Sequence, residues 1–121
     1  MDTKNLLYLV TRGPEEPMRI TSALMLAITA ASTGNRASVF FHLDGVKAIT
    51  AQSALKEESG QYPGTLKAVE QARAVGVELY ASEESLLMYG LSSRDIIQGV
   101  KVVGSVKINE LMSESDAVLS L

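Results

Sequence analysis

The chain has 121 residues, a net charge of −3 at pH 7, 46% hydrophobic and 21% charged residues. This balance is that of one soluble globular domain and excludes a disordered chain, so we predict a single domain spanning residues 1–121. The sequence has no cysteine, which excludes a disulfide-built fold, a thiolate nucleophile and a cysteine metal site.

Lysines and arginines are scattered and aromatic residues make up only 5% of the chain, so nucleic acid is not an expected partner. The apolar run Leu6–Val10 is too short for the core of a signal peptide. The apolar stretch 20–31 is interrupted by polar residues and is shorter than the roughly 20 residues that span a bilayer. We therefore predict a cytoplasmic protein with no membrane contact.

The first half of the chain alternates strand and helix signals. Residues 6–10 form a continuous apolar run, typical of a strand buried on both faces. Glu15-Glu16-Pro17 indicates a helix start, with two carboxylates suited to the positive end of the helix dipole, and Gly34 indicates its end. A second strand is predicted over 38–43, one or two helical turns over 46–49, a loop over 57–64 and a helix over 65–75.

The second half continues the alternation. A strand is predicted over 77–80, followed by Ser82 as the N-cap of a short helix that Gly90 ends. Ser92 and Asp95 have the spacing of a capping box. A strand over 100–103, a helix over 105–112 and a strand over 117–119 complete the chain. This order predicts a three-layer α/β/α fold with a five-stranded parallel sheet.

In parallel sheets, ligands bind beyond the carboxyl ends of the strands, but no strong catalytic motif follows any strand here. GxGxxG, GxxxxGK[ST] and GxSxG are absent. The single histidine, His42, cannot build a multi-histidine metal site, and we predict neither a metal nor a cofactor. Two interpretations of His42 stay open: it pairs with Asp44, or it lies at the sheet edge with one hydrogen bond. Two also stay open for Arg12: it binds an anion, or its side chain is only solvated.

Three segments resemble the DsrE/DsrF-like family. They are residues 5–17, residues 40–46 (Phe-Phe-His-Leu-Asp-Gly-Val, similar to that family's F-F-x-x-D-G strand) and residues 77–91. The match continues through Asp95-Ile-Ile-Gln-Gly-Val and the helix after Gly104, so it covers nearly the whole chain. The resemblance implies a five-stranded parallel domain that assembles into trimers or hexamers.

The resemblance also implies that Ser82 stands where sulfur-relay members carry a persulfide on cysteine. A serine cannot hold a transferable sulfur, so the sulfurtransferase activity does not carry over. Ser82 belongs either to a branch with another role or to a chain in which a cysteine was replaced. A side chain at a helix N-terminus still faces backbone N–H groups that favour a small anion or polar metabolite. The ligand-binding candidates are Arg12, Gly13, His42, Asp44, Gly45, Ser82 and Ser85.

These observations favour a cysteine-less relative of the relay proteins that binds a small ligand or a partner protein, rather than an enzyme. Two alternatives stay open. One is an enzyme that uses His42, Asp44 and Arg12 on a small substrate. The other is a structural subunit that completes a hetero-oligomer with cysteine-bearing sulfur-relay paralogues.

Two further predictions concern the surface. The helix that ends before Gly34 carries a second apolar edge, Met25, Leu26 and Ala30, which we expect to take part in a homo-oligomer contact. Residues 53–64 lack hydrophobic periodicity. We expect this loop to be the most mobile internal segment, to border the strand-end cleft and to be the first site of limited proteolysis.

Overall fold

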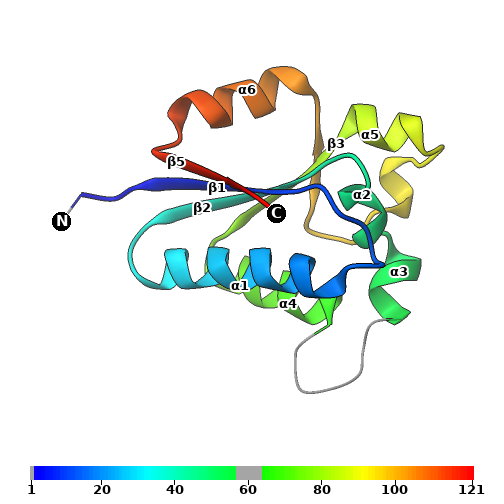
Figure 1. The fold of residues 1–121 in the computed structure, drawn as a ribbon, viewed down its shortest axis with the longest axis horizontal. Coiled ribbons are helices and arrows are strands. Elements are labelled where there is room, and N and C mark those ends of the chain that lie inside the picture. The colour runs from blue at the N-terminus through cyan, green and yellow to red at the C-terminus, as the bar shows by residue number, and fades with distance from the viewer. Residues whose placement is uncertain (1, 57–63) are drawn as a thin grey trace.

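A computed structural model describes residues 2–56 and 64–121 of the chain (Figure 1). Its strands are β1 (Asn5–Val10), β2 (Arg36–Phe41), β3 (Glu78–Ser82), β4 (Lys101–Val103) and β5 (Ala117–Ser120). They form one sheet in the order β4-β3-β2-β1-β5, and every neighbouring pair is parallel. The expectation of a five-stranded parallel sheet is confirmed.

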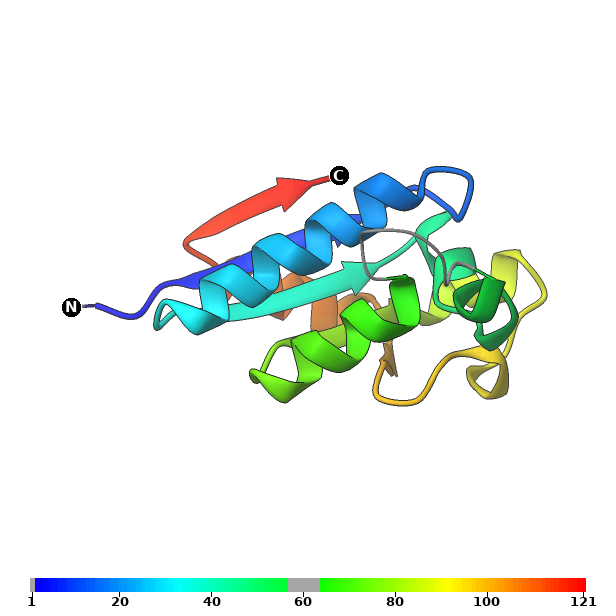
Figure 2. The same cartoon turned by 90° about the horizontal axis from the view of Figure 1, so that it is seen from below.

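Helices cover both faces of this sheet, as predicted. Helices α1 (Pro17–Ser32) and α4 (Thr65–Ala74) lie together on one face, and α6 (Ser105–Glu114) lies on the other (Figures 1 and 2). Three short helices gather beyond the carboxyl ends of the strands: α2 (Gly45–Ala48), α3 (Ala51–Lys56) and α5 (Glu83–Met88). Among the described helices, none is long and apolar enough to cross a membrane.

The two faces of the sheet are covered to different degrees. The main core lies between the sheet and the α1–α4 layer, where Val10, Ile20 and Phe41 are fully buried. Under α6 the buried cluster is small, consisting of Leu7, Phe40 and Tyr80. No residue of α6 is itself fully buried. The α6 face therefore contributes less apolar burial to stability, since that contribution grows with the area removed from water.

The ends of α1 follow the sequence signals. Proline stands in the first turn, where its missing N–H costs nothing, and Gly34 adopts a φ of 91° just after the helix. The two acidic residues before Pro17 bind groups near the turn instead of capping the helix. Glu15 Oε1 accepts a hydrogen bond from Gly13 N at 3.2 Å, and Glu16 Oε1 accepts one from Arg19 Nε at 3.0 Å.

Some boundaries differ from the expectations. Strand β2 begins two residues earlier than predicted and ends at Phe41, so residues 42 and 43 lie beyond the strand. Leu43 has a φ of 52°, which an extended strand cannot accommodate. Residues 53–56 were predicted to begin a loop but belong to α3. Their hydrophobic periodicity is too weak to indicate a helix. The remainder of the loop predicted over 53–64 lies outside the described residues, apart from Gly64 before α4. The Ser92–Asp95 capping box is confirmed.

Candidate functional site

The turns after β1 and β2 pack against each other through two glycines. His42 N donates to Val10 O at 3.0 Å, and a Cβ at Gly45 would lie only 2.1 Å from that same oxygen. A Cβ at Gly13 would lie 3.2 Å from Asp44 O and 2.7 Å from Glu15 Oε2. Glycine at both positions therefore lets the two backbones approach closely. The structure thus brings Gly13, Asp44 and Gly45 together at the predicted edge.

The turn after β3 is tied to the turn after β2 by two serines. Ser82 is the N-cap of α5, and its Oγ accepts a hydrogen bond from Ser85 N at 3.1 Å. Ser85 is 3% exposed, and its own Oγ accepts from Leu43 N at 2.8 Å. The N-cap interpretation of Ser82 is confirmed. Because Leu43 adopts a left-handed conformation, its N–H depends on this serine rather than on the strand ladder.

Asp44 is occupied by partners other than histidine. Its Oδ1 accepts a hydrogen bond from the Tyr89 hydroxyl and lies 3.4 Å from Lys47 Nζ. Lys47 Nζ also lies 4.1 Å from the centre of the Tyr89 ring. The Tyr89 hydrogen bond, with help from Lys47, lowers the pKa of Asp44, and the same hydrogen bond raises the pKa of Tyr89. Of the two alternatives for His42, the pairing with Asp44 does not form, because Asp44 is the N-cap of α2 and no longer shares the strand's alternation.

His42 packs on an aromatic ring. Its imidazole stacks on Phe40, with ring centres 5.3 Å apart, and its Nε2 is buried without a hydrogen-bond partner in the described part of the chain. Burial lowers the pKa of His42, because the charged imidazolium loses hydration. The predicted single hydrogen bond of an edge histidine is therefore not seen at Nε2.

The pH dependence of stability tests this burial. Since the folded pKa of His42 lies below its unfolded value of about 6.5, the unfolded chain binds more protons just below that pH. The free energy of unfolding should therefore fall as the pH drops from about 7 to about 5. His42→Gln should flatten this window and leave the loss below pH 4, where carboxylates such as Asp44 titrate. Urea unfolding of both proteins across about pH 3–8 measures the profile, and identical profiles for the two proteins would contradict the burial of His42 as its cause.

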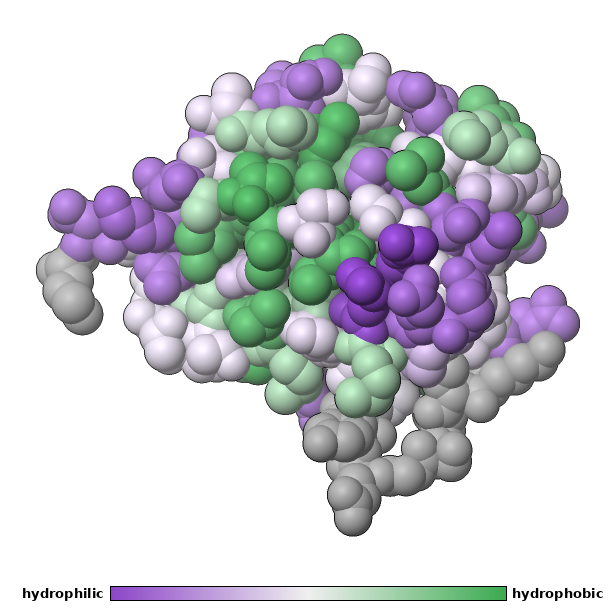
Figure 3. All heavy atoms as spheres, in the orientation of Figure 1, coloured by the Kyte–Doolittle hydropathy of each residue, from purple (hydrophilic) through white to green (hydrophobic). Residues whose placement is uncertain are grey.

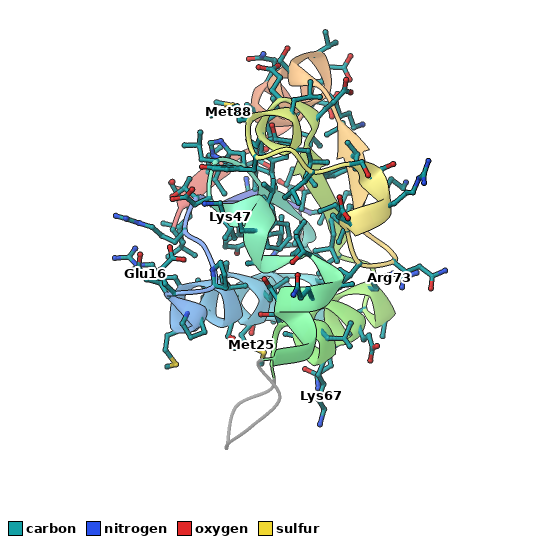
Figure 4. All side chains as sticks on the ribbon, turned by 90° about the vertical axis from the view of Figure 1, so that its right-hand side faces the viewer. Glu16, Met25, Lys47, Lys67, Arg73 and Met88 are labelled. Atoms are coloured by element: carbon teal, nitrogen blue, oxygen red, sulfur yellow. The ribbon has the colours of Figure 1, made fainter. Side chains whose placement is uncertain are left out.

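Arg12 stands apart from the other candidates. Its Nε lies 3.5 Å from Glu16 Oε2, and its side chain is 55% exposed. An exposed ion pair of this kind contributes little to stability and leaves the guanidinium at the rim of the turn. The structure therefore does not assemble Arg12, His42 and Asp44 into one catalytic group. Figure 4 views this end of the molecule, with Glu16 at its left margin and Lys47 near its centre.

Sequence reasoning missed Lys47, Tyr89 and Leu43. The i,i+3 spacing of Asp44 and Lys47 was a usable signal, since such neighbours meet on a helical turn. Tyr89 lies 45 residues beyond Asp44, and nothing local connects the two. In the residues described here, no cluster of three or more His, Cys, Asp or Glu side chains could hold a metal ion.

Two hollows flank the strand ends. The first lies between the turn that follows β1, the turn that follows α2 and the turn that follows α5. The second lies between the first turns of α5 and α6. The residues lining the first include Pro14, Lys47, Thr50, Ser53, Tyr89 and Arg94. Those lining the second are Glu83, Glu84, Val103, Gly104, Ser105, Val106, Lys107 and Glu110. The second hollow adjoins Ser82, and its charged lining consists of three glutamates and one lysine.

Together these features define an open parallel α/β protein whose candidate site is built from the turns after β1, β2 and β3. The chain belongs to the DsrE/DsrF-like family, whose model matches residues 4–121. A comparison with curated proteins finds no match.

Solved structures share the fold. The ychN protein of E. coli superimposes with a TM-score of 0.82 at 18% identity, covering 98% of this chain and 100% of its own. The MTH1491 protein of Methanobacterium thermoautotrophicum gives 0.70 at 19% identity, covering 99% and 100%. The BT1422 protein of Bacteroides thetaiotaomicron gives 0.71 at 13% identity, covering 98% and 95%. At these identities the likeness is one of fold.

Proposed function

We propose that this chain is a DsrE/DsrF-like binding protein that works without carrying sulfur, in an assembly with copies of itself. The observation that carries the proposal is Ser82. It stands at the position that the family resemblance assigns to the relay cysteine, and its Oγ serves as the cap acceptor of α5. No other residue can take over the sulfur, because the sequence contains no cysteine.

A partner protein suits this site better than a small anion. Leu43 N is satisfied by Ser85 Oγ, and Ser85 N is satisfied by Ser82 Oγ, so these backbone donors are already used. The adjoining hollow carries the carboxylates of Glu83 and Glu84, which repel anions. Cysteine-bearing paralogues of the relay type are one class of partner that the resemblance suggests.

Self-association is supported by an apolar face around the β5 edge. Leu26 of α1, Met112 of α6, and Val118 and Leu119 of β5 are each 41–45% exposed. Figure 3 shows hydrophobic residues gathered over β5, between α6 and α1. Strand β5 is also an edge strand with one unpaired side, which a second chain can cover. Of the edge predicted on α1, Met25 and Leu26 are 40% and 41% exposed, whereas Ala30 is buried in the core.

Light scattering after size exclusion tests the assembly. We expect the protein at micromolar concentration to elute as a trimer or hexamer, and Leu119→Lys to lower its mass to that of a monomer, because a buried ammonium is costly. Val75→Lys is the matched control, since Val75 is 43% exposed at the end of α4, a helix that packs mainly on α1, α3 and β3. A monomeric parent protein would refute the proposed assembly. Equal effects of both variants would show that the contact between copies does not use the β5 edge.

A further inference from the structure

The most exposed large hydrophobic residues in the described part of the chain lie close to Ser82. They are Val106 at 74%, Leu87 at 72% and Met88 at 65% exposure. Leu87 and Met88 belong to α5, and Val106 belongs to the first turn of α6. Figure 4 shows Met88 at the outer side of α5. We call these three residues and the acidic hollow between the helices the α5–α6 surface.

The apolar exposure follows from how α5 is held. Ser85 and Leu86 are its buried residues, whereas Glu83, Glu84, Leu87 and Met88 are exposed. Residues four apart share a helix face, so Glu83 lies beside Leu87 and Glu84 beside Met88. The outer side of this short helix therefore pairs two carboxylates with two large apolar side chains. Neither the two carboxylates nor the two apolar side chains are among the residues that α5 buries against the rest of the domain.

The charges of the α5–α6 surface indicate which kind of partner it can bind. Glu83, Glu84 and Glu110 line the hollow between the helices. The one cation lining it, Lys107, has its Nζ 5.7 Å from the centre of the buried Tyr80 ring. A surface with three carboxylates and an apolar rim is complementary to a segment that carries both Lys or Arg and apolar side chains. The same charges oppose anionic lipid surfaces and nucleic acids.

We propose that the α5–α6 surface docks a basic amphipathic segment of another protein, next to Ser82. This proposal rests on the proposed function, because it names the chemistry of the partner that the site binds. Apolar side chains of the segment cover Leu87, Met88 and Val106, while its cations face Glu83 and Glu84. The contact needs no sulfur transfer, and it lies apart from the β5 edge where copies of this chain associate.

The test uses a fluorescent peptide built only of Leu and Lys at helical spacing, and a second peptide in which Glu replaces Lys. The Leu–Lys peptide should bind, and the Leu–Glu peptide should not. Combining Leu87→Ala with Met88→Ala should weaken binding about tenfold, as loss of a small apolar hot spot does. Combining Glu83→Gln with Glu84→Gln should weaken it about fivefold and reduce its salt dependence. The matched control combines Met18→Ala with Glu70→Gln, two exposed positions on α1 and α4, and should bind as the parent does.

Amide chemical shifts locate the contact. The Leu–Lys peptide should move the signals of residues 83–88 and 104–110 and leave those of β5 unchanged. Absence of binding, equal binding of both peptides, or shifts confined to β5 would overturn the docking proposal. Light scattering separates this failure from that of the assembly, because the two depend on different faces. A lower mass for the Leu87→Ala, Met88→Ala protein would show that a second copy occupies the surface, which would also overturn it.

Discussion

Replacing Gly45 by alanine should lower the free energy of unfolding by about 3 kcal/mol or more, at the upper end of the effect of inserting an atom into a packed site. The new Cβ would lie 2.1 Å from Val10 O and 2.9 Å from Val10 C. Val10 ends the inner strand β1, is fully buried, and its oxygen already accepts from His42 N. Relief therefore requires the turns after β1 and β2 to separate. The gain from a less flexible unfolded chain, about 0.4–1 kcal/mol, is too small to compensate.

Gly104→Ala provides the matched control for this experiment. Apart from its chain neighbours, no heavy atom of the described residues lies within 4 Å of a Cβ at Gly104, and its φ of −91° suits any residue. Since it is the N-cap of α6, alanine there should cost about 1 kcal/mol or less. Urea unfolding at one fixed protein concentration measures both variants, so that the proposed self-association would affect the two measurements equally. Equal losses for the two would show that the close approach of Gly45 to Val10 does not constrain the fold.

Ser82→Cys should create a thiol with a pKa below the usual value of about 8.5, by roughly one unit, and hence about tenfold more thiolate at neutral pH. Ser85 N donates to this position at 3.1 Å, and a hydrogen bond to the charged form favours that form. Glu83 and Glu84 act in the opposite direction, but both are exposed and their effect is screened by water. The rate of alkylation measured against pH gives the pKa of the new thiol. All of the signal comes from position 82, because the parent sequence has no cysteine.

Ser92→Cys is the control, because Ser92 is also an N-cap. Its Oγ lies 3.4 Å from Asp95 Oδ2, and a neighbouring carboxylate disfavours a thiolate. Its thiol should titrate at or above about 8.5. If Ser82→Cys shows the same inflection as Ser92→Cys, then position 82 is only a helix cap and its match to the relay cysteine says little about reactivity.

The sequence by itself determined the layers of this protein. The run Leu6–Val10, the stripe of apolar residues along α1 and the alternation of strands with helices are local signals, and local burial patterns fix them. The caps at Ser82 and at Ser92 with Asp95 were equally readable, because a cap and its helix are adjacent in the chain. The family resemblance then predicted where the candidate site lies.

Only the tertiary structure decided which turns of the candidate site contact one another and through which hydrogen bonds. The hydrogen bond from Tyr89 to Asp44 spans 45 residues, and the one from Leu43 N to Ser85 Oγ spans 42. No periodicity links positions so far apart. The left-handed turn at Leu43 ended the alternation of β2 and turned Asp44 away from His42 toward Tyr89 and Lys47. The need for glycine at position 45 likewise arises from the oxygen of another strand, a contact that exists only once β1 and β2 are paired.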